Sequence, residues 1–534
     1  MSSVVGRRAA TVGETFLATV QDRGDAPAIL DADLEVVLSW RDYGALARRA
    51  AAGLAALGLG HQQTLGLLLH NRPEFHIADA GALLLGATPF SMYNTSAPEQ
   101  LAHLISDAGC RIVITEAALH DPLRAALEQQ PGTVEHVIVV ESDSWSDLLA
   151  ANEIGHTSAA GPQDLATLIY TSGTTGPPKG VELTHHNILT MAAEMADLVG
   201  AKAEHRTISY LPMAHIAERA CTHYLPMAVG FSVVCCPSPG AVTRMLPRVR
   251  PQLFFSPPRL WEKLKAAIAA DVATRADPAE IRRRLGFGEL EAALTGAAPC
   301  PPGLIDFFAS LGIRLREVYG LSETTGVVSL AGAGDVRAGT VGPPLPSAQV
   351  RTADDGELLV RGPLVMAGYR NLPEATAAAI DDDGWLHTGD IARLGADGHL
   401  RIIDRKKELI INAAGKNMSP ANIEARLKEG SPLIGQACAI GNGRPYNVAL
   451  IVVDPVVAAA YQGDDALRAE VQAGVDRANA RLARVEQIKR FAIVTDEWLP
   501  DSTELTPTMK LKRRPIEQKY AADIDALYTT KEIR

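Results

Sequence analysis

The sequence predicts an α/β protein with a large N-terminal body of α/β subdomains, a β-rich subdomain that ends this body, and a smaller α+β C-terminal domain. The chain has 534 residues, which is too long for one ordinary domain. Between residues 62 and 140, apolar strand patterns alternate with helical patterns, as in a parallel sheet with helical crossovers. From about residue 335, short strands follow one another across Asp-Gly turns.

The alternating segment at residues 62–140 gives the most regular pattern in the chain. Short apolar runs bounded by turn residues predict strands that are buried on both faces. Ser96 and Glu99 have the spacing of a capping box, which predicts that a helix begins there. We expect strands at residues 64–69, 88–93, 111–115 and 136–140, and helices at 73–85 and 96–108.

A compact charge cluster marks the predicted domain junction. Asp355-Gly356 and Asp397-Gly398 are turn dipeptides flanked by short strands, and a charge cluster at residues 404–408 follows directly. Such a cluster between apolar strands is typical of a boundary between domains. We therefore predict an N-terminal domain at residues 1–403 and a C-terminal domain at residues 404–534.

Composition limits the classes of function. The chain has 51 Lys and Arg against 62 Asp and Glu, so its net charge of −11 disfavours nucleic acid or an anionic membrane as the main partner. The 6 Cys form no C-x-x-C pair, so we predict neither a disulfide framework nor a zinc ribbon. No apolar stretch approaches the roughly 20 residues of a membrane span. We read Arg7-Arg8 as the start of an amphipathic helix rather than an export signal, and expect a cytoplasmic protein.

The most informative segment is an apolar strand that enters a loop rich in glycine and hydroxyl residues at residues 168–180. Glycines let backbone N–H groups approach an anion closely, hydroxyls donate further hydrogen bonds, and a lysine adds positive charge. The spacing differs from a Walker loop, because Gly180 follows the lysine. The alternative is a surface turn that is merely rich in Gly and Thr. The predicted polyphosphate-binding residues are Thr171, Ser172, Gly173, Thr174, Thr175, Gly176 and Lys179.

This loop resembles the signature of the adenylate-forming superfamily, which includes acyl-CoA synthetases, peptide-synthetase adenylation domains and luciferases. Four further segments resemble the family's other motifs in the same order, at residues 319–325, 384–390, 404–424 and 507–510. The resemblance implies the fold of that superfamily, with a mobile C-terminal domain that carries the hinge and the catalytic lysine. It also implies a reaction in which a carboxylate attacks the α-phosphate of ATP to give acyl-AMP and pyrophosphate, after which a thiol displaces AMP.

The resemblance implies a role for each matching residue. Glu323 would bind Mg²⁺, Lys407 would be the hinge, and Lys510 would act at the α-phosphate. The alternative for Glu323 is a carboxylate that only complements a helix dipole. The alternative for Lys510 is a lysine in an ordinary solvated basic run, with Lys512 as the second candidate for its role. The implied contacts with nucleotide or CoA are Gly296, Ala297, Tyr319, Gly320, Thr324, Asp390, Arg405 and Gly415.

Residues 210–219 resemble the acyl-pocket segment of long-chain fatty acyl-CoA synthetases. His215 and Ala298 are therefore expected in the acid pocket, although His215 could equally be a core histidine. The leading prediction is an ATP-dependent fatty acyl-CoA synthetase that uses ATP, Mg²⁺ and CoA. A ligase for another acid or for a carrier-protein thiol, and a nucleotide-binding regulatory protein without turnover, are the alternatives. Peripheral contact with a membrane also stays open.

Overall fold

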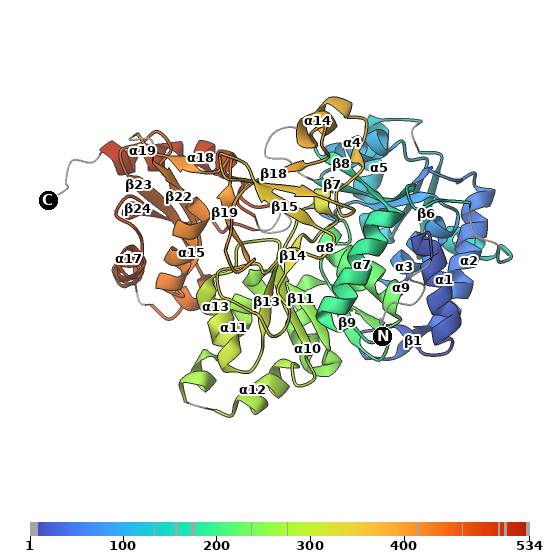
Figure 1. The fold of residues 1–534 in the computed structure, drawn as a ribbon, viewed down its shortest axis with the longest axis horizontal. Coiled ribbons are helices and arrows are strands. Elements are labelled where there is room, and N and C mark those ends of the chain that lie inside the picture. The colour runs from blue at the N-terminus through green and yellow to red at the C-terminus, as the bar shows by residue number, and fades with distance from the viewer. Residues whose placement is uncertain are drawn as a thin grey trace.

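The structure is a computed structural model that describes residues 9–132, 134–154, 159–171, 177–236, 238–274, 276–413, 416–461, 463–499, 502–506 and 510–529. Figure 1 shows a large body, which holds the N-terminal and middle parts of the chain, with the last part beside it as a separate smaller domain. The predicted fold class is therefore confirmed, including the separate C-terminal domain.

The first sheet has seven strands in the order β17-β8-β7-β4-β3-β5-β6. The pairs among β7, β4, β3, β5 and β6 are parallel, which confirms the predicted β-α-β units. These strands are β3 (Thr64–Leu68), β4 (Thr88–Ser91), β5 (Ile112–Thr115), β6 (His136–Val139), β7 (Leu165–Thr171), β8 (Lys179–Thr184) and β17 (Gly368–Tyr369). The helices of this part are α1 (Val12–Arg23), α2 (Trp40–Ala56), α3 (Pro73–Leu84), α4 (Pro98–Ala108), α5 (His120–Gln129), α6 (Asp143–Leu149) and α7 (His185–Val199).

One local prediction in this region is wrong. Helix α4 does not use the predicted capping box of Ser96 and Glu99, because its N-cap is Ala97 and Pro98 occupies the first helical position. Proline suits that position, since its fixed φ is already helical and its missing N–H would have had no partner there. The Gln100 side chain accepts a hydrogen bond from the Ala97 N–H at 3.1 Å, so the reciprocal contact sits one residue later than predicted.

Two smaller sheets complete the α/β part of the body. One has the order β2-β1-β10-β9 and the other β11-β12-β13-β14. Their strands are β1 (Pro27–Leu30), β2 (Val36–Ser39), β9 (Arg206–Ser209), β10 (Ser232–Cys235), β11 (Leu253–Ser256), β12 (Ala292–Gly296), β13 (Leu315–Tyr319) and β14 (Ser329–Leu330). The helices between them are α8 (Ile216–Arg219), η2 (Ala220–Tyr224), α9 (Leu225–Val229), α10 (Val242–Val249), α11 (Pro258–Ala273), α12 (Pro278–Leu285), α13 (Pro302–Ser310) and the short turn η4 (Ser322–Thr324).

The predicted β-rich subdomain is a four-stranded antiparallel sheet in the order β15-β16-β18-β19. Its strands are β15 (Gln349–Thr352), β16 (Glu357–Arg361), β18 (Leu386–Leu394) and β19 (Leu400–Arg405), with α14 (Pro373–Ala379) before β18. Both Asp-Gly turns lie at hairpins, and Gly356 and Gly398 adopt φ of 85° and 79° there. Strand β19 continues two residues beyond the expected boundary at residue 403, so Asp404 and Arg405 belong to this sheet.

The C-terminal domain has its own core around the three-stranded sheet β22-β23-β24. Its helices α15 and α17 pack on each other and on this sheet. The elements are β20 (Ile410–Ile411), β21 (Asn417–Met418), α15 (Pro420–Gly430), β22 (Ile434–Ile440), β23 (Asn447–Val453), α16 (Pro455–Ala458), α17 (Asp464–Asn479), β24 (Ile488–Val494), α18 (Arg513–Lys519) and α19 (Ala521–Thr529).

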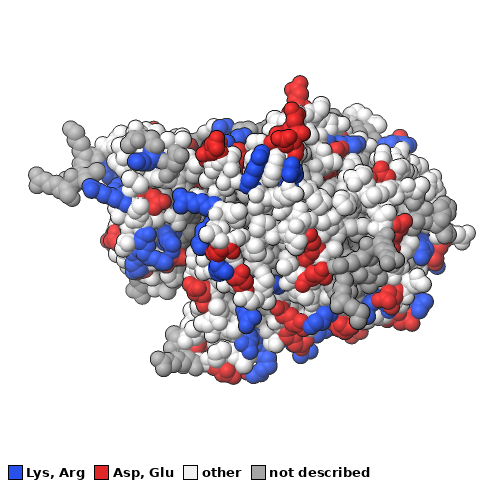
Figure 2. All heavy atoms as spheres, viewed as in Figure 1, with Lys and Arg blue, Asp and Glu red and all other residues white. Residues whose placement is uncertain are grey.

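Charge is distributed unevenly between the two domains. Residues 404–534 contain 20 Lys and Arg against 18 Asp and Glu, so the acidic excess of the chain lies in the body. Figure 2 shows Lys and Arg side chains gathered on the C-terminal domain, at the left of the view. The domains meet through ion pairs, in which Lys428 Nζ lies 3.1 Å from Glu262 Oε1 and Arg259 lies 3.6 Å from Asp454. Within the described part of the chain, every helix is too short or too polar to cross a bilayer.

Candidate active site

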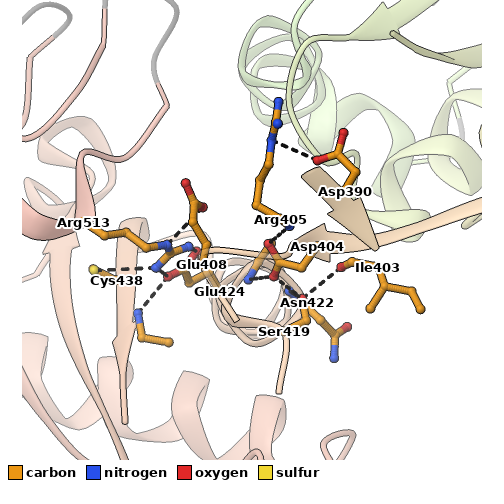
Figure 3. Close-up of polar contacts among 12 residues, drawn as sticks. Asp390, Ile403, Asp404, Arg405, Glu408, Ser419, Asn422, Glu424, Cys438 and Arg513 are labelled. Carbon is orange, nitrogen blue, oxygen red and sulfur yellow. Dashed lines mark hydrogen bonds and ion pairs between the residues drawn. The ribbon is translucent and has the colours of Figure 1, made fainter. Parts of the chain in front are cut away.

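Tyr319, Asp390 and Arg405 come from three different strands and meet at one carboxylate. The Tyr319 hydroxyl donates to Asp390 Oδ2 at 2.6 Å, and Arg405 Nε lies 2.9 Å from Oδ1 of the same carboxylate. Arg405 ends β19 directly opposite Asp390 in β18, and Figure 3 shows its side chain reaching toward that residue. Burial raises the pKa of Asp390, while the Arg405 charge and the Tyr319 hydroxyl act in the opposite direction. The structure thus brings together all three residues that were predicted around the nucleoside.

Glu323 and Lys179 both contact Tyr369. Glu323 belongs to η4, whose position is fixed when the Met366 N–H donates to the Glu323 carbonyl at 2.9 Å. The Tyr369 hydroxyl donates to Glu323 Oε1 at 2.8 Å. Lys179, the first residue of β8, has its Nζ 4.8 Å from the centroid of the same ring, which is a cation–π distance. One tyrosine side chain therefore contacts both a carboxylate and an ammonium group.

The turn that carries Glu323 is too tight for other residues at its base. A Cβ on Gly320 would lie 2.5 Å from the backbone carbonyl of Gly326, so only glycine fits. Thr324 is fully buried, and its hydroxyl accepts from the Leu321 N–H at 2.9 Å and donates to the Leu321 carbonyl at 3.2 Å. Thr324 therefore stabilises the turn, and its contact with the α-phosphate stays a prediction.

A second constrained loop follows β12. A Cβ on Gly296 would lie 2.7 Å from the Val318 carbonyl oxygen, and Ala297 has a positive φ of 64°, which is rare for a residue with a side chain. Ala298 is half-buried in the same loop. Glu317 supports the loop, because the Cys300 N–H donates to its Oε1 at 3.2 Å. Burial raises the pKa of Glu317 to about 8, so this side chain is a neutral acid at pH 7.

His215 is the N-cap of α8, where its Nδ1 accepts a hydrogen bond from the Ala217 N–H at 3.2 Å. Burial and the charge of Lys510 lower the pKa of His215 to about 4, so the ring is neutral at pH 7. Because Nδ1 accepts, the proton of the neutral ring is assigned to Nε2, which can donate to a substrate carboxylate. The alternative of a core histidine fits less well, because the side chain is only half-buried.

Lys510 reaches the body of the protein from the C-terminal domain. Its backbone N–H donates to Thr506 Oγ1 at 3.0 Å, which fixes the residue just before α18. Its ammonium interacts electrostatically with Arg405, Asp390 and Glu323. Lys510 keeps an exposed surface, but its pKa is lowered. Desolvation is the main cause and the positive charge of Arg405 the second, while the nearby carboxylates act in the opposite direction.

Lys512, the second candidate, is committed to its own domain. Its Nζ donates to the Ser502 carbonyl oxygen at 2.8 Å, and its backbone N–H donates to the Glu504 carbonyl oxygen at 2.7 Å. The geometry therefore favours Lys510 over Lys512 as the lysine that faces the body.

Lys407 lies between two anchored residues. On its N-terminal side, the Lys406 N–H donates to the Gly389 carbonyl oxygen at 2.8 Å and Lys406 Nζ donates to Glu357 Oε2 at 2.9 Å, both in the body. On its C-terminal side, Glu408 pairs with Arg513 of the C-terminal domain at 3.3 Å. Lys407 itself is exposed, and no side-chain partner of it is recorded among the described residues. This arrangement supports the predicted hinge.

Asp404, three residues before the hinge, links the domains directly. Its Oδ2 accepts hydrogen bonds from the Ser419 hydroxyl at 2.5 Å and from the Ala421 N–H at 3.1 Å, at the N-terminus of α15. Figure 3 shows Asp404 directed toward Ser419 and Arg405 directed toward Asp390, as successive residues of a strand point to opposite faces. Strand β19 thus contacts the C-terminal domain on one face, and on the other face it contributes Arg405 to the cluster with Tyr319 and Asp390.

Some predicted residues lie outside the described part of the chain. Thr171 ends β7 and pairs with Lys179 across the loop mouth. The remaining predicted residues that lie outside the described ranges are Ser172, Gly173, Thr174, Thr175, Gly176 and Gly415. Among the described residues there is also no cluster of three or more His, Cys, Asp or Glu side chains that could hold a metal by themselves.

Tyr369 and Glu317 are site residues that the sequence reasoning missed. Glu317 lies two residues before Tyr319 in β13, so the two-residue period of a strand places both side chains on one face and could have identified it. Tyr369 lies in a two-residue strand 46 positions after Glu323, and no local pattern connects the two. The pairing of β17 with β8 and the hydrogen bond from the Met366 N–H to the Glu323 carbonyl oxygen bring them together.

Comparison with known proteins identifies the family. Residues 16–370 match the AMP-binding enzyme family, and residues 407–532 match the AMP-binding enzyme C-terminal domain. A Mycobacterium tuberculosis protein named provisionally as the fatty-acid–CoA ligase FadD11 is 45% identical over 70% of this chain and 75% of its own length. The long-chain-fatty-acid–CoA ligase FadD15 of Mycobacterium bovis is 34% identical over 90% of each chain.

A solved structure agrees with these matches. The fatty acyl CoA synthetase of Mycobacterium tuberculosis superposes with a TM-score of 0.70 and 26% identity, covering 96% of this chain and 99% of that one. The resemblance to long-chain fatty acyl-CoA synthetases that the five motifs indicate is thus confirmed over both domains. The chain belongs to the AMP-binding enzyme family, whose members form acyl adenylates.

Proposed function

We propose that the protein is an AMP-forming long-chain fatty acid–CoA ligase. The observation that carries the proposal is the approach of Lys510, from the C-terminal domain, to Glu323, Asp390 and Arg405 of the body. A regulatory protein without turnover would not need this approach across the domain boundary. The names of the relatives, which are fatty-acid–CoA ligases, supply the class of acid and the acceptor CoA.

In the first step, a carboxylate oxygen of the acid forms a bond to the α-phosphorus of ATP, and the bond to the β-phosphate oxygen breaks to release pyrophosphate. A carboxylate is a weak nucleophile and negative charge accumulates at phosphorus, so positioning and charge neutralisation must provide the catalysis. Lys510 would neutralise the α-phosphate and the attacking carboxylate. His215, neutral at pH 7, would donate one hydrogen bond to that carboxylate from Nε2.

The donor set suits Mg²⁺ brought in with ATP. Mg²⁺ prefers oxygen ligands and usually takes one or two carboxylates together with phosphate oxygens and water. Glu323 offers such a carboxylate, and one of its oxygens accepts a hydrogen bond from Tyr369. We infer that Glu323 holds the cation of Mg²⁺·ATP, which would offset charge on the leaving pyrophosphate.

In the second step, the sulfur of CoA forms a bond to the carbonyl carbon of acyl-AMP, and the bond to the AMP oxygen breaks. We propose that the part of the C-terminal domain that follows Lys407 turns about this residue between the steps, because the side chains of residues 406 and 408 are anchored to different domains. Lys510 would then leave the site and Gly415 would approach it.

The acid pocket is proposed to lie along residues 210–219 and the loop at Ala298. In this segment Tyr210, Met213 and Ile216 are buried, which provides an apolar wall next to His215. Since ATP and CoA are intracellular substrates, we also propose a cytoplasmic location. A different acid, or a carrier-protein thiol in place of CoA, is the second candidate, and the assay below separates it.

The test is ATP–pyrophosphate exchange across a panel of carboxylic acids, followed by acyl-CoA formation with CoA present. The proposal predicts exchange that is strongest with fatty acids of long chain and complete conversion to acyl-CoA on addition of CoA. Exchange without acyl-CoA formation would favour a carrier-protein acceptor. An absence of exchange with every acid would contradict the proposed enzyme activity.

A further inference from the structure

Tyr369 contacts both charged residues at the polyphosphate end of the site. It lies in the edge strand β17, in register with Val181 of β8, so its ring stands next to Lys179 at the start of that strand. Lys179 Nζ lies 4.8 Å from the ring centroid. The hydroxyl of the same residue donates to Glu323 Oε1 at 2.8 Å. One side chain therefore joins the end of the phosphate loop to the carboxylate of η4.

The backbone of Tyr369 is fixed independently of these two contacts. Its N–H donates to Thr376 Oγ1 at 2.9 Å. The adjacent residues complete the strand pairing, with the Ala367 N–H donating to the Glu182 carbonyl oxygen at 3.0 Å and the Arg370 N–H donating to the Gly180 carbonyl oxygen at 2.7 Å. A residue held this firmly can set the orientation of the two charged side chains that contact it.

The Tyr369 hydroxyl acts as a hydrogen-bond donor at neutral pH. An ordinary tyrosine is protonated at neutral pH, and the oxygen 2.8 Å from its hydroxyl belongs to a carboxylate, which accepts hydrogen bonds. The phenol therefore keeps its proton and directs it at Oε1. For Glu323 Oε2, no partner is recorded among the described residues, which leaves that oxygen available to a cation.

We propose that Tyr369 is a positioning residue for the metal–polyphosphate end of the site. Its hydroxyl orients the Glu323 carboxylate toward the cation of Mg²⁺·ATP, and its ring face holds the Lys179 ammonium beside the phosphates. This inference rests on the proposed function, in which Mg²⁺·ATP is a substrate. Partners that orient a metal ligand typically change metal affinity about 10- to 100-fold when they are removed.

The test uses Mn²⁺ as the probe, in the presence of α,β-methylene-ATP, with electron paramagnetic resonance to measure free Mn²⁺. Tyr369→Phe keeps the ring and removes the hydroxyl, so we expect Mn²⁺ to bind about tenfold more weakly in the ternary complex. Tyr446→Phe is the matched control, because that hydroxyl donates to the Leu527 carbonyl oxygen at 3.0 Å in the C-terminal domain. The control should bind Mn²⁺ as the wild type does.

A double-mutant cycle tests whether Tyr369 acts through Glu323. In a Glu323→Gln background, Tyr369→Phe should cause no further loss of Mn²⁺ affinity. For the ring, Tyr369→Leu should raise the metal-free dissociation constant of the analogue roughly two- to fivefold, since a cation–π contact is lost, whereas Tyr369→Phe should not.

Three results would overturn the inference: Mn²⁺ affinity of Tyr369→Phe within twofold of the wild type, a full tenfold loss that persists in the Glu323→Gln background, or a wild type that binds no Mn²⁺ with the analogue. Acid-dependent pyrophosphate exchange is measured on the same wild-type preparation. If that exchange occurs and Mn²⁺ affinity is unchanged by Tyr369→Phe, the proposed function stands and only the role of Tyr369 is rejected.

Discussion

Glu218 is a fully buried carboxyl group that four donors approach, in the segment that we propose as the acid pocket. Its Oε1 accepts hydrogen bonds from the Ser209 hydroxyl at 2.8 Å, the Tyr210 N–H at 2.9 Å and the Thr222 hydroxyl at 3.0 Å, with the Asn71 amide at 3.2 Å. Burial outweighs these donors and raises its pKa to about 7.

Glu218→Gln should change how stability depends on pH. A glutamate in the unfolded chain has a pKa of about 4.3, so between roughly pH 4.5 and 7 the folded protein holds a proton that the unfolded chain has lost. Stability therefore falls as pH rises through this window. The glutamine variant should lose this slope and be more stable than the wild type at pH 8, by on the order of 2 kcal/mol.

Urea unfolding at pH 5, 6, 7 and 8 would measure this effect. Glu128→Gln, which changes an exposed glutamate in α5, is the matched control and should keep the wild-type slope. The account of Glu218 would be contradicted if its glutamine variant kept that slope too.

The neighbouring Arg219 has a side-chain partner that its own sequence segment does not reveal. Arg219 and Asp79 form an ion pair whose side chains have no exposed surface, and His223 Nε2 lies 2.8 Å from the other oxygen of Asp79. In the sequence these residues read only as polar positions within apolar helices. The motif resemblance predicted Tyr319, Asp390 and Arg405 together, because each stands at a fixed place in its motif. It could not predict Tyr369 or Asp79, whose partners lie far away in the chain.

At the scale of elements, the hinge segment is the feature on which the proposed reaction depends. Residue 406 is bonded to β16 and β18 of the body, while Glu408 is bonded to α18 of the C-terminal domain. We therefore propose that a change of domain orientation rotates the backbone at Lys407 and breaks the hydrogen bond from the Glu408 N–H to the Arg405 carbonyl oxygen, which is 3.0 Å long. Mobile hinges are commonly a few residues of this kind.

Lys407→Pro should separate the two half-reactions. Proline fixes φ and restricts the preceding residue, so the backbone at this position could no longer rotate. We expect acyl-AMP formation, measured as pyrophosphate exchange, to stay close to the wild-type rate. Acyl-CoA formation from supplied acyl-AMP should fall about tenfold or more. Lys407→Ala, which keeps a flexible backbone, serves as the control for loss of the side chain. Equal loss of both half-reactions in the proline variant would reject the hinge.

Helices and strands could be predicted where the sequence pattern was long. The prediction of a boundary failed where a single residue decided it. The parallel strands β3 to β6 follow from apolar runs that alternate with helices, and they were predicted correctly. The start of α4 was missed by one residue, because Pro98 at the first helical position outweighs the capping-box spacing of Ser96 and Glu99. The two-residue strand β17 carries no pattern at all and forms only because β8 offers it an edge.

At the scale of the whole molecule, the relative orientation of the two domains decides which lysine meets the body. The order of the domains could be predicted from the motifs, but their orientation could not, because it depends on contacts between surfaces that are far apart in the sequence. Those contacts include hydrogen bonds to Asp404 and ion pairs. Lys428 of α15 pairs with Glu262 of α11 at 3.1 Å, and both side chains are mostly buried.

Reversing one charge of this ion pair should shift the orientation of the C-terminal domain. Glu262→Lys places two positive charges together and should slow pyrophosphate exchange roughly two- to fivefold, since a partly buried ion pair contributes on the order of 1 kcal/mol. Lys428→Glu should act in the same direction. The double variant Glu262→Lys with Lys428→Glu restores opposite charges and should recover most of the exchange rate. Additive losses in the double variant would show that the pair does not hold the domains in this orientation.

The central claim is that Lys510 completes an adenylating site from the other domain, and separate assays of the two half-reactions of Lys510→Ala test it most directly. Pyrophosphate exchange should fall by about 100-fold or more, as when one charge-stabilising group is removed, while acyl-CoA formation from supplied acyl-AMP should be largely retained. Lys512→Ala, at a lysine that bonds within its own domain, should retain exchange. Normal exchange in Lys510→Ala, or its loss only in Lys512→Ala, would contradict the account.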